Sequence, residues 1–372
     1  MTAVLHAVDV LPRTGHGPRL HVDLGAVGFN TQVLKRATAG ALMAVVKADG
    51  FGHGAADVAR TALAHGASWL GVTSIDEAIA LRTAGFRTPM LSWLNGTDAD
   101  FGAAIASEVD LAVPSRDHLD ATLRAGLGAR IHLHLDCGMA RDGAPPEDWA
   151  GLCRAARRAE RQGRVRVVGL MGHLACADEP GHADNATGRA RFAWGLEVAR
   201  RHGLRPPLRH LAATSATLTD PLSHHTMSRV GAGLVGIDPT RTTALRPAMT
   251  LTAPVVGVRS VRAGTTVGYG ATWTASRRTH LALLPLGYAD GLPRATAGRA
   301  EVLLRGRRRP VVGRISMDQV VVDVGDEAPG LGEVAVVFGP GDAGEPTVRE
   351  WADWADTIEH EIVTGIGARV AR

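Results

Sequence analysis

Short apolar segments alternate with segments of helical periodicity from about residue 20 to residue 235, and this alternation constrains the fold more than any other feature. The apolar segments are bounded by Gly, Pro, Ser or Asp, as strands commonly are. Strands are expected at 42–46, 69–73, 89–93, 111–113, 131–135, 165–170, 208–211 and ending at 229–230. Helices are expected at 55–65, 75–84, 116–125, 149–162, 185–202 and 215–220. Eight such repeats predict a (β/α)8 barrel, and a doubly wound sheet is the alternative.

The pattern changes after Arg246-Pro247, where Val-rich segments alternate with Gly-rich turns. Strands are expected at 253–261, 280–285, 301–304, 310–312, 320–324 and 334–338, with one amphipathic helix at 347–355. We therefore predict two domains, a barrel over residues 1–246 and a mostly β domain over residues 247–372. The first 17 or so residues are expected either to be disordered or to pack on the C-terminal domain.

The composition narrows the functional class. The chain has 372 residues, a net charge of +4 and only 4% aromatic residues, so nucleic acid is not the expected partner. The basic run 305–309 is interpreted as a solvated turn between strands. The three cysteines lack metal-site spacing, and no export signal or membrane-length apolar run is seen. We expect a cytoplasmic protein without a metal site.

Lysine is almost absent from this chain, which has only Lys35 and Lys47 among 41 basic residues. Lys35 lies in an amphipathic run and is interpreted as a solvated helix residue. Lys47 follows the apolar run 42–46 and precedes a glycine-rich turn. Barrel enzymes carry their reactive groups at this end of a strand, so Lys47 is the candidate for a Schiff-base amine.

A Schiff-base lysine suggests pyridoxal 5'-phosphate, whose phosphate needs hydrogen-bond donors. Thr214-Ser215 opens the helix after the seventh strand, and Gly231-Ala232-Gly233 follows the eighth strand. Barrels commonly bind phosphate at these two places. The alternative is structural: Ser215 caps its helix, and the glycines only turn the chain.

Three further side chains could act on such a cofactor. Arg229 could donate a hydrogen bond to the pyridine nitrogen and keep it unprotonated, which makes the cofactor a weaker electron sink; the alternative is an ordinary ion pair. Tyr269 and Tyr288, the only tyrosines, lie in glycine-flanked turns, where a phenol can present its hydroxyl to a site. His173, at the end of the sixth strand, is either a polarising group or a buried histidine with satisfied hydrogen bonds.

Seven motifs, in order, resemble alanine racemase from about residue 18 to the C-terminus. They lie at 44–54, 135–141, 172–173, 229–231, 267–272, 287–291 and 312–319. The resemblance implies a fold-type III pyridoxal-phosphate enzyme that forms a head-to-tail homodimer. Each active site would combine the barrel of one chain with the C-terminal domain of the other.

The resemblance also assigns the two bases. Lys47 would hold the cofactor and serve as the base for the D-substrate. Tyr269 from the partner chain would serve the L-substrate from the opposite face, with His173 and Arg229 behind it. Racemisation requires two bases on opposite faces, because one base returning its own proton tends to preserve configuration.

The remaining site residues follow from the same motifs. Ser215, Gly231 and Ala232 would bind the phosphate. Arg141 would bond the cofactor's phenolic oxygen and assist the substrate carboxylate, which also meets the amide of Met317 from the partner. Tyr288 would form part of the entrance gate, with Asp318 as a supporting residue.

Three positions depart from the family pattern. Phe51 and Ala368 stand where the family commonly has hydroxyl groups that reach the phosphate, so two hydrogen bonds would be lost, each worth about 1 to 2 kcal/mol. His134 stands where the family often has a carbamylated lysine that orients the arginine, so Arg141 must be held differently. These changes leave both bases intact.

The function implied by the resemblance is interconversion of L- and D-alanine, which supplies D-alanine for peptidoglycan. The alternatives are a racemase for another small amino acid such as serine, or a homologue in secondary metabolism. A fold-type III decarboxylase or aldolase, or a non-catalytic pyridoxal-phosphate carrier, fits less well. A decarboxylase does not need the Tyr269 loop, an aldolase of this fold would be expected to show a metal site, and carriers resemble the barrel alone.

Overall fold

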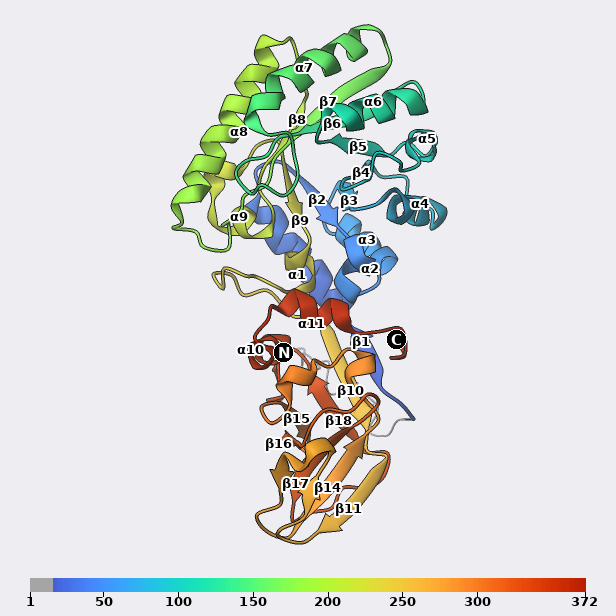
Figure 1. The fold of residues 1–372 in the computed structure, drawn as a ribbon, viewed down its shortest axis with the longest axis vertical. Coiled ribbons are helices and arrows are strands. Elements are labelled where there is room, and N and C mark those ends of the chain that lie inside the picture. The colour runs from blue at the N-terminus through green and yellow to red at the C-terminus, as the bar shows by residue number, and fades with distance from the viewer. Residues whose placement is uncertain (1–15) are drawn as a thin grey trace, which may run out of the picture. The chain divides into compact units, whose positions relative to one another are not determined.

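The structure is a computed structural model and describes residues 16–372. The chain forms two compact units, one over Val27–Leu245 and one made of residues 16–26 together with Arg246–Arg372. Each unit is built around its own eight-stranded sheet (Figure 1). The expectation for the first 17 or so residues concerns mainly residues 1–15, which lie outside the described part of the chain.

The first sheet is parallel and runs in the order β8-β7-β6-β5-β4-β3-β2-β9. Its strands are β2 (Ala41–Val45), β3 (Trp69–Val72), β4 (Met90–Ser92), β5 (Asp110–Val113), β6 (Ala129–His134), β7 (Val165–Met171), β8 (Leu208–His210) and β9 (Met227–Val230). The two end strands are joined by backbone hydrogen bonds, because Thr226 N–H donates to Arg209 O at 3.1 Å and Arg229 N–H donates to Ala212 O at 3.0 Å. The barrel prediction is therefore confirmed over the doubly wound alternative, whose end strands would lie apart.

Helices follow the strands around the barrel (Figure 1). They are α1 (Leu24–Ala37), α2 (Lys47–Gly52), α3 (Ala55–Ala64), α4 (Ile75–Thr83), α5 (Phe101–Ala106), α6 (Arg116–Ala125), α7 (Pro146–Arg161), α8 (Ala183–Arg201) and α9 (Thr214–Thr219). Local capping explains where several begin: Ser74 accepts Glu77 N–H, and Ser115 accepts His118 N–H. Lys35, on α1, donates to Gly40 O at 2.8 Å and so is engaged in holding the chain before β2.

The second sheet is antiparallel and runs in the order β1-β10-β18-β15-β16-β17-β14-β11. Its strands are β1 (Arg19–Val22), β10 (Met249–Pro254), β11 (Gly257–Val261), β14 (Thr279–Leu284), β15 (Glu301–Leu304), β16 (Arg307–Val312), β17 (Val320–Gly325) and β18 (Val334–Phe338). A separate ribbon pairs β12 (Thr266–Val267) with β13 (Trp273–Thr274). Two helices accompany them, α10 (Val348–Ala355) and α11 (Glu359–Gly365).

The structure differs from the sequence interpretation in several segments of this second unit, among them the ribbon of β12 and β13. β1 pairs with β10, with Leu20 opposite Leu251, although residues 1–246 were all assigned to the barrel. The expected strand 253–261 is two strands, because β10 ends at Pro254. Only Arg305 and Gly306 of the basic run form the turn, and Arg307 begins β16; Arg305 pairs with Glu333 at 2.6 Å. The helix α11 was not expected.

No helix among residues 16–372 combines the length and the apolar character that a membrane span needs.

Candidate active site

Lys47 lies two residues after β2, at the carboxyl end of a barrel strand. The four residues that follow, Ala48 to Phe51, all have left-handed backbone angles, with φ values of 50°, 53°, 63° and 58°. Such a conformation costs roughly 1–2 kcal/mol for each residue that carries a Cβ. Hydrogen bonds stabilise the turn: Ala48 N–H donates to Glu77 Oε1 at 2.7 Å, and Ala55 N–H donates to Asp49 Oδ1 at 2.9 Å. Glu77 therefore fixes the backbone beside the lysine.

The surroundings of Lys47 favour a neutral amine. Burial lowers the pKa of Lys47, and the positive charge of Arg141 lowers it further, while the carboxylate of Glu77 opposes both effects. A neutral amine is the nucleophilic form of lysine. The pKa of Lys47 is thus shifted in the direction that favours a Schiff-base lysine.

Arg229 lies on β9, the strand that pairs with β2, and is buried. Its Nη1 donates to His210 Nδ1 at 2.9 Å and to His210 O at 2.8 Å, and its Nη2 donates to Gly172 O at 2.8 Å and His173 Nδ1 at 3.2 Å. Burial lowers the pKa of Arg229 to about 10, so it stays charged at neutral pH. Arg229 is held by carbonyl and imidazole acceptors and not by the ion pair of the alternative interpretation. No acceptor within residues 16–372 is bonded to its Nε.

His173 follows β7 and receives Arg229 on Nδ1, so its remaining hydrogen lies on Nε2. Burial lowers the pKa of His173 to about 3, and the positive charges of Arg229, Arg141 and Lys47 contribute to the shift. His173 is therefore neutral. Arg229 contacts His173 directly, and the charges of Arg141 and Lys47 also act on it.

Two loops meet where a phosphate was predicted. Thr214 Oγ1 accepts the N–H groups of Gly231 and Gly233, both at 3.3 Å, and so ties the start of α9 to the loop after β9. Ser215 and Ala232, beside these residues, are both buried. A Cβ at Gly231 would lie 2.6 Å from two atoms of the Phe51 ring, which explains why glycine is needed there. The amide of Gly231 is thus already bonded, whereas the Ser215 hydroxyl and the Ala232 amide make no hydrogen bond within residues 16–372.

Arg141 is exposed and lies within the loop that joins β6 to α7. Asp136 Oδ1 accepts the N–H groups of Gly138 at 2.8 Å and Met139 at 2.9 Å, which fixes the loop that carries the arginine. His134 Nδ1 lies 3.2 Å from Asp142 Oδ2. His134, which stands where the family often has a carbamylated lysine, therefore has a carboxylate partner in Asp142, the residue after Arg141.

The remaining predicted residues belong to the second unit. Tyr269, Tyr288 and Met317 are exposed, with 71%, 42% and 53% of their surface accessible. The loops that carry them are joined to one another: Tyr288 N–H donates to Ser316 O at 3.0 Å, and Gly268 packs beside the backbone of Arg314. Three exposed side chains on adjoining tight loops form a surface suited to complete a site.

Asp318 is held by an ion pair, because Arg369 Nη2 lies 2.7 Å from its Oδ1. Arg369 also lies 3.2 Å from Asp290 Oδ1, and Asp290 Oδ2 accepts Gly287 N–H at 2.8 Å. Asp318 is therefore linked through the C-terminal segment to the loop of Tyr288, which fits a supporting position.

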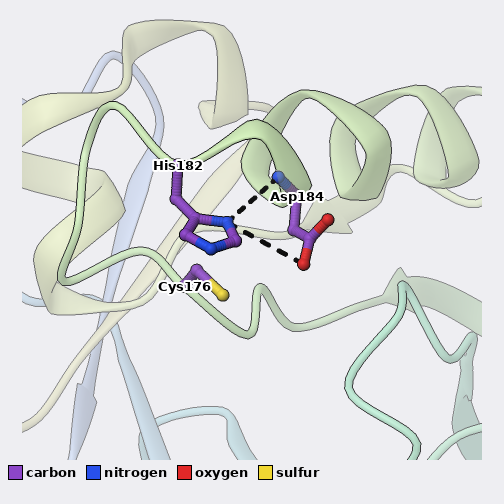
Figure 2. Close-up of side chains that lie close together, drawn as sticks. All are labelled: Cys176, His182 and Asp184. Atoms are coloured by element: carbon purple, nitrogen blue, oxygen red, sulfur yellow. Dashed lines mark hydrogen bonds and ion pairs between the residues drawn. The ribbon is translucent and has the colours of Figure 1, made fainter.

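Cys176, His182 and Asp184 lie close together near the start of α8, although the spacing of the three cysteines does not indicate a metal site (Figure 2). Their potential ligand atoms lie within 4.8 Å of one another. His182 Nδ1 accepts Asp184 N–H at 3.2 Å, so the imidazole lone pair is used to cap the helix. We assign His182 to capping of α8.

Sequence reasoning missed two residues that organise this site, Glu77 and His210. Glu77 sits inside a helical pattern, where a surface carboxylate is the ordinary interpretation. His210 ends the expected strand 208–211, and a polar residue at the end of a barrel strand was the available signal.

Models of two families match the chain in sequence. The alanine racemase N-terminal domain matches residues 22–239, and the alanine racemase C-terminal domain matches residues 248–372. Among curated proteins, alanine racemase of Frankia casuarinae is 46% identical over 362 residues, covering 94% of each chain. Alanine racemase of Thermobifida fusca is 45% identical, covering 94% of this chain and 96% of its own.

The structural comparison agrees. Alanine racemase from D-cycloserine producing Streptomyces lavendulae superposes with a TM-score of 0.94 at 42% identity, over 96% of this chain and 97% of that one. The N-terminal barrel and the C-terminal antiparallel domain are thus shared along nearly the whole length. The chain belongs to the alanine racemase family of isomerases, whose reaction is the interconversion of L- and D-alanine.

Proposed function

We propose that this protein racemises alanine with pyridoxal 5'-phosphate, using two bases on opposite faces of the substrate. The observation that carries the proposal is Lys47, a lysine with a lowered pKa at the carboxyl end of β2, with Arg229 on the neighbouring strand. Lys47 would hold pyridoxal phosphate, whose conjugated ring supplies the electron withdrawal that makes the Cα proton of an amino acid acidic.

The residues around Lys47 fit this cofactor. Glycine at position 231 lets the loop after β9 pack directly against Phe51, four residues after Lys47. The Ser215 hydroxyl and the Ala232 amide supply donors. Arg229 has both terminal nitrogens engaged, which leaves Nε–H to donate to the ring nitrogen. Because guanidinium only donates, it keeps that nitrogen unprotonated.

Each base acts in one direction. Lys47 Nζ takes the Cα proton of the D-enantiomer, and Tyr269 of the partner subunit takes that of the L-enantiomer from the other face. The exposed position of Tyr269 supports its use across a subunit interface. His173, a neutral imidazole with Nε2–H available, is suited to orient the phenol oxygen.

Substrate binding uses a residue from each subunit. Arg141 would meet the substrate carboxylate together with the amide of the partner subunit's Met317. Tyr288 would narrow the entrance, with Asp318 supporting its loop. We propose a cytoplasmic homodimer that supplies D-alanine for peptidoglycan; the free, buried thiols of Cys137 and Cys153 are consistent with a reducing compartment.

Borohydride reduction followed by peptide mapping tests the cofactor assignment. Treating the protein with pyridoxal phosphate and then borohydride should leave a pyridoxyl group on Lys47 and none on Lys35, whose amine is engaged with Gly40 O. Lys35 is the internal control, since the chain has no other lysine. Labelling of Lys35 alone, or of neither lysine, would overturn the assignment.

Subunit complementation tests the shared site. Lys47→Ala and Tyr269→Phe dimers should each lack racemase activity. Mixed dimers would contain one site with both residues intact, so a refolded equimolar mixture should regain about one quarter of wild-type activity, because half the dimers are mixed and half their sites are whole. A mixture as inactive as its parents would contradict a site built from two chains.

A further inference from the structure

Three buried polar residues of the barrel lie behind Arg229 and have no part in the reaction described above. Asp110 begins β5, His132 lies on β6 and His210 ends β8, and only 2%, 0% and 0% of their surfaces are accessible. Around them the barrel interior is apolar, and the His132 and Trp69 rings meet edge to face, with centroids 6.0 Å apart. Buried titratable groups in such surroundings are costly unless each is hydrogen-bonded.

These residues form one hydrogen-bonded chain that ends on Arg229. Arg229 Nη1 contacts His210 Nδ1 at 2.9 Å, and His210 Nε2 contacts His132 Nδ1 at 2.8 Å. His132 Nε2 contacts Asp110 Oδ2 at 3.2 Å. Arg130 also binds Asp110, through Nε at 2.7 Å, so the far end of the chain is fixed as well.

The two ends of this chain determine where every proton in it lies. Arg229 can only donate, so His210 Nδ1 accepts and the hydrogen of His210 is on Nε2. His210 then donates to His132 Nδ1, and the hydrogen of His132 is on Nε2, facing a carboxylate that can only accept. Either imidazole in its other tautomer would set two N–H groups against each other. Every hydrogen bond in the series from Arg229 through His210 and His132 to Asp110 is therefore donated toward Asp110.

The barrel leaves space specifically for the His132 ring. A Cβ at Gly169 on β7 would lie 2.0 Å from His132 Nδ1, so any side chain there would displace the ring. The pairing of β6 with β7 is also irregular between Ile131 and His132. Glycine and a register irregularity both weaken a sheet, so the barrel accommodates this imidazole at some cost in stability.

We propose that Asp110 and His132 are positioning residues for the racemisation, holding His210 in the one tautomer that accepts a hydrogen bond from Arg229. The inference rests on the proposed function, in which Arg229 Nε meets the cofactor ring. If His210 adopts the other tautomer, its Nδ1–H faces the guanidinium Nη1–H. Arg229 must then shift, and Nε moves with it.

Asp110→Asn is the informative substitution. It keeps the shape of the side chain and can reverse the direction in which the hydrogen bonds are donated. The new amide can donate to His132 Nε2, which places the hydrogen of His132 on Nδ1 and that of His210 on Nδ1. A comparable carboxylate-to-amide change in serine proteases acts by imposing the wrong tautomer. Since the effect here passes through two imidazoles, we expect kcat to fall roughly 10- to 100-fold, the range for residues that orient a site indirectly. KM should change less than about threefold, since substrate contacts are kept.

The direct readout is the tautomer of each histidine, from side-chain ¹⁵N NMR of the intact, histidine-labelled protein. In the wild type, His132 and His210 should both carry hydrogen on Nε2, and in Asp110→Asn both should carry it on Nδ1. The wild-type spectrum alone tests the tautomer assigned to His210. If His210 is protonated on Nδ1, or on both nitrogens, the proposal is overturned even if the variant fails to fold.

Two comparisons separate positioning from general destabilisation. Asp57→Asn makes the same change at an exposed carboxylate paired with Arg60, and should leave kcat and both tautomers unchanged. Asp110→Glu keeps an acceptor-only partner for His132 and should retain the wild-type tautomers and most of kcat. Asp110→Asn with reversed tautomers and unaltered kcat would overturn the positioning role while leaving the racemase assignment intact. Loss of that assignment would instead appear as unlabelled Lys47 after borohydride reduction.

Discussion

Replacing Gly231 by alanine tests the contact that ties the loop after β9 to the left-handed turn beside Lys47. The added Cβ would lie 2.6 Å from the Cε2 and Cζ atoms of Phe51, whereas ordinary contacts begin at 3.4 Å. The ring and the loop must therefore separate by 3.4 − 2.6 = 0.8 Å. Phe51 is buried within a strained turn, so little of this shift can be absorbed by the ring alone.

We expect Gly231→Ala to lower the free energy of unfolding by about 1–3 kcal/mol, the usual cost of overpacking. The shift also moves the predicted phosphate donors, so pyridoxal phosphate should bind roughly tenfold more weakly. Chemical denaturation and a cofactor titration followed by absorbance measure the two effects. Gly181→Ala is the matched control, because a Cβ there meets nothing within 4 Å.

Combining Gly231→Ala with Phe51→Leu tests whether the clash with the Phe51 ring causes the loss of stability. The smaller side chain removes the ring atoms that the new methyl group meets, so the double variant should recover at least about 1 kcal/mol relative to the sum of the single changes. Strictly additive losses would show that the contact with Phe51 is not the source of the strain, and would refute the steric argument.

Three further predictions follow from single contacts. Phe51→Tyr restores the hydroxyl that the family commonly has and should tighten cofactor binding about tenfold, measured by absorbance titration, if that oxygen reaches the phosphate. Glu77→Gln removes the carboxylate that opposes the lowered pKa of Lys47, so the pH midpoint for pyridoxal-phosphate attachment should move downward; an upward move would contradict the electrostatic assignment. Burial lowers the pKa values of His173 and His210, so both bind protons more weakly when folded. Their contribution to stability is full above the unfolded pKa of about 6.5 and is lost below it, and denaturation curves should show a loss of up to about 3 kcal/mol from pH 7.5 to 5.5.

The barrel was readable from sequence because its strands are short, fully buried runs separated by helices. Each of the eight expected strands is present, and the ring closes through hydrogen bonds that no local pattern encodes. The helices α5 and α11 were missed because segments of six and seven residues are too short to show a helical period. β1 was misplaced because its four residues are defined by pairing with β10, far along the chain.

The chemistry of the site was predictable only in part. Lys47 stood out because lysine is rare here, and Arg229 because it precedes a glycine loop. The left-handed turn was not predictable, because Ala48, Asp49 and Phe51 carry side chains that disfavour positive φ, and Glu77 stabilises the turn from another helix. The chain from Arg229 to Asp110 was equally hidden, since its four members come from four different strands and meet only when the barrel closes.

The measurement that most directly tests two-base racemisation is proton exchange at the alanine Cα in deuterated water, followed by ¹H NMR and chiral chromatography. With pyridoxal phosphate, the wild type should convert L-alanine into D-alanine carrying deuterium at Cα. Tyr269→Phe should abolish this conversion while retaining Cα exchange of D-alanine, because Lys47 still serves that face. Formation of no D-alanine by the wild type, or equal loss of exchange from both enantiomers in the variant, would contradict the account.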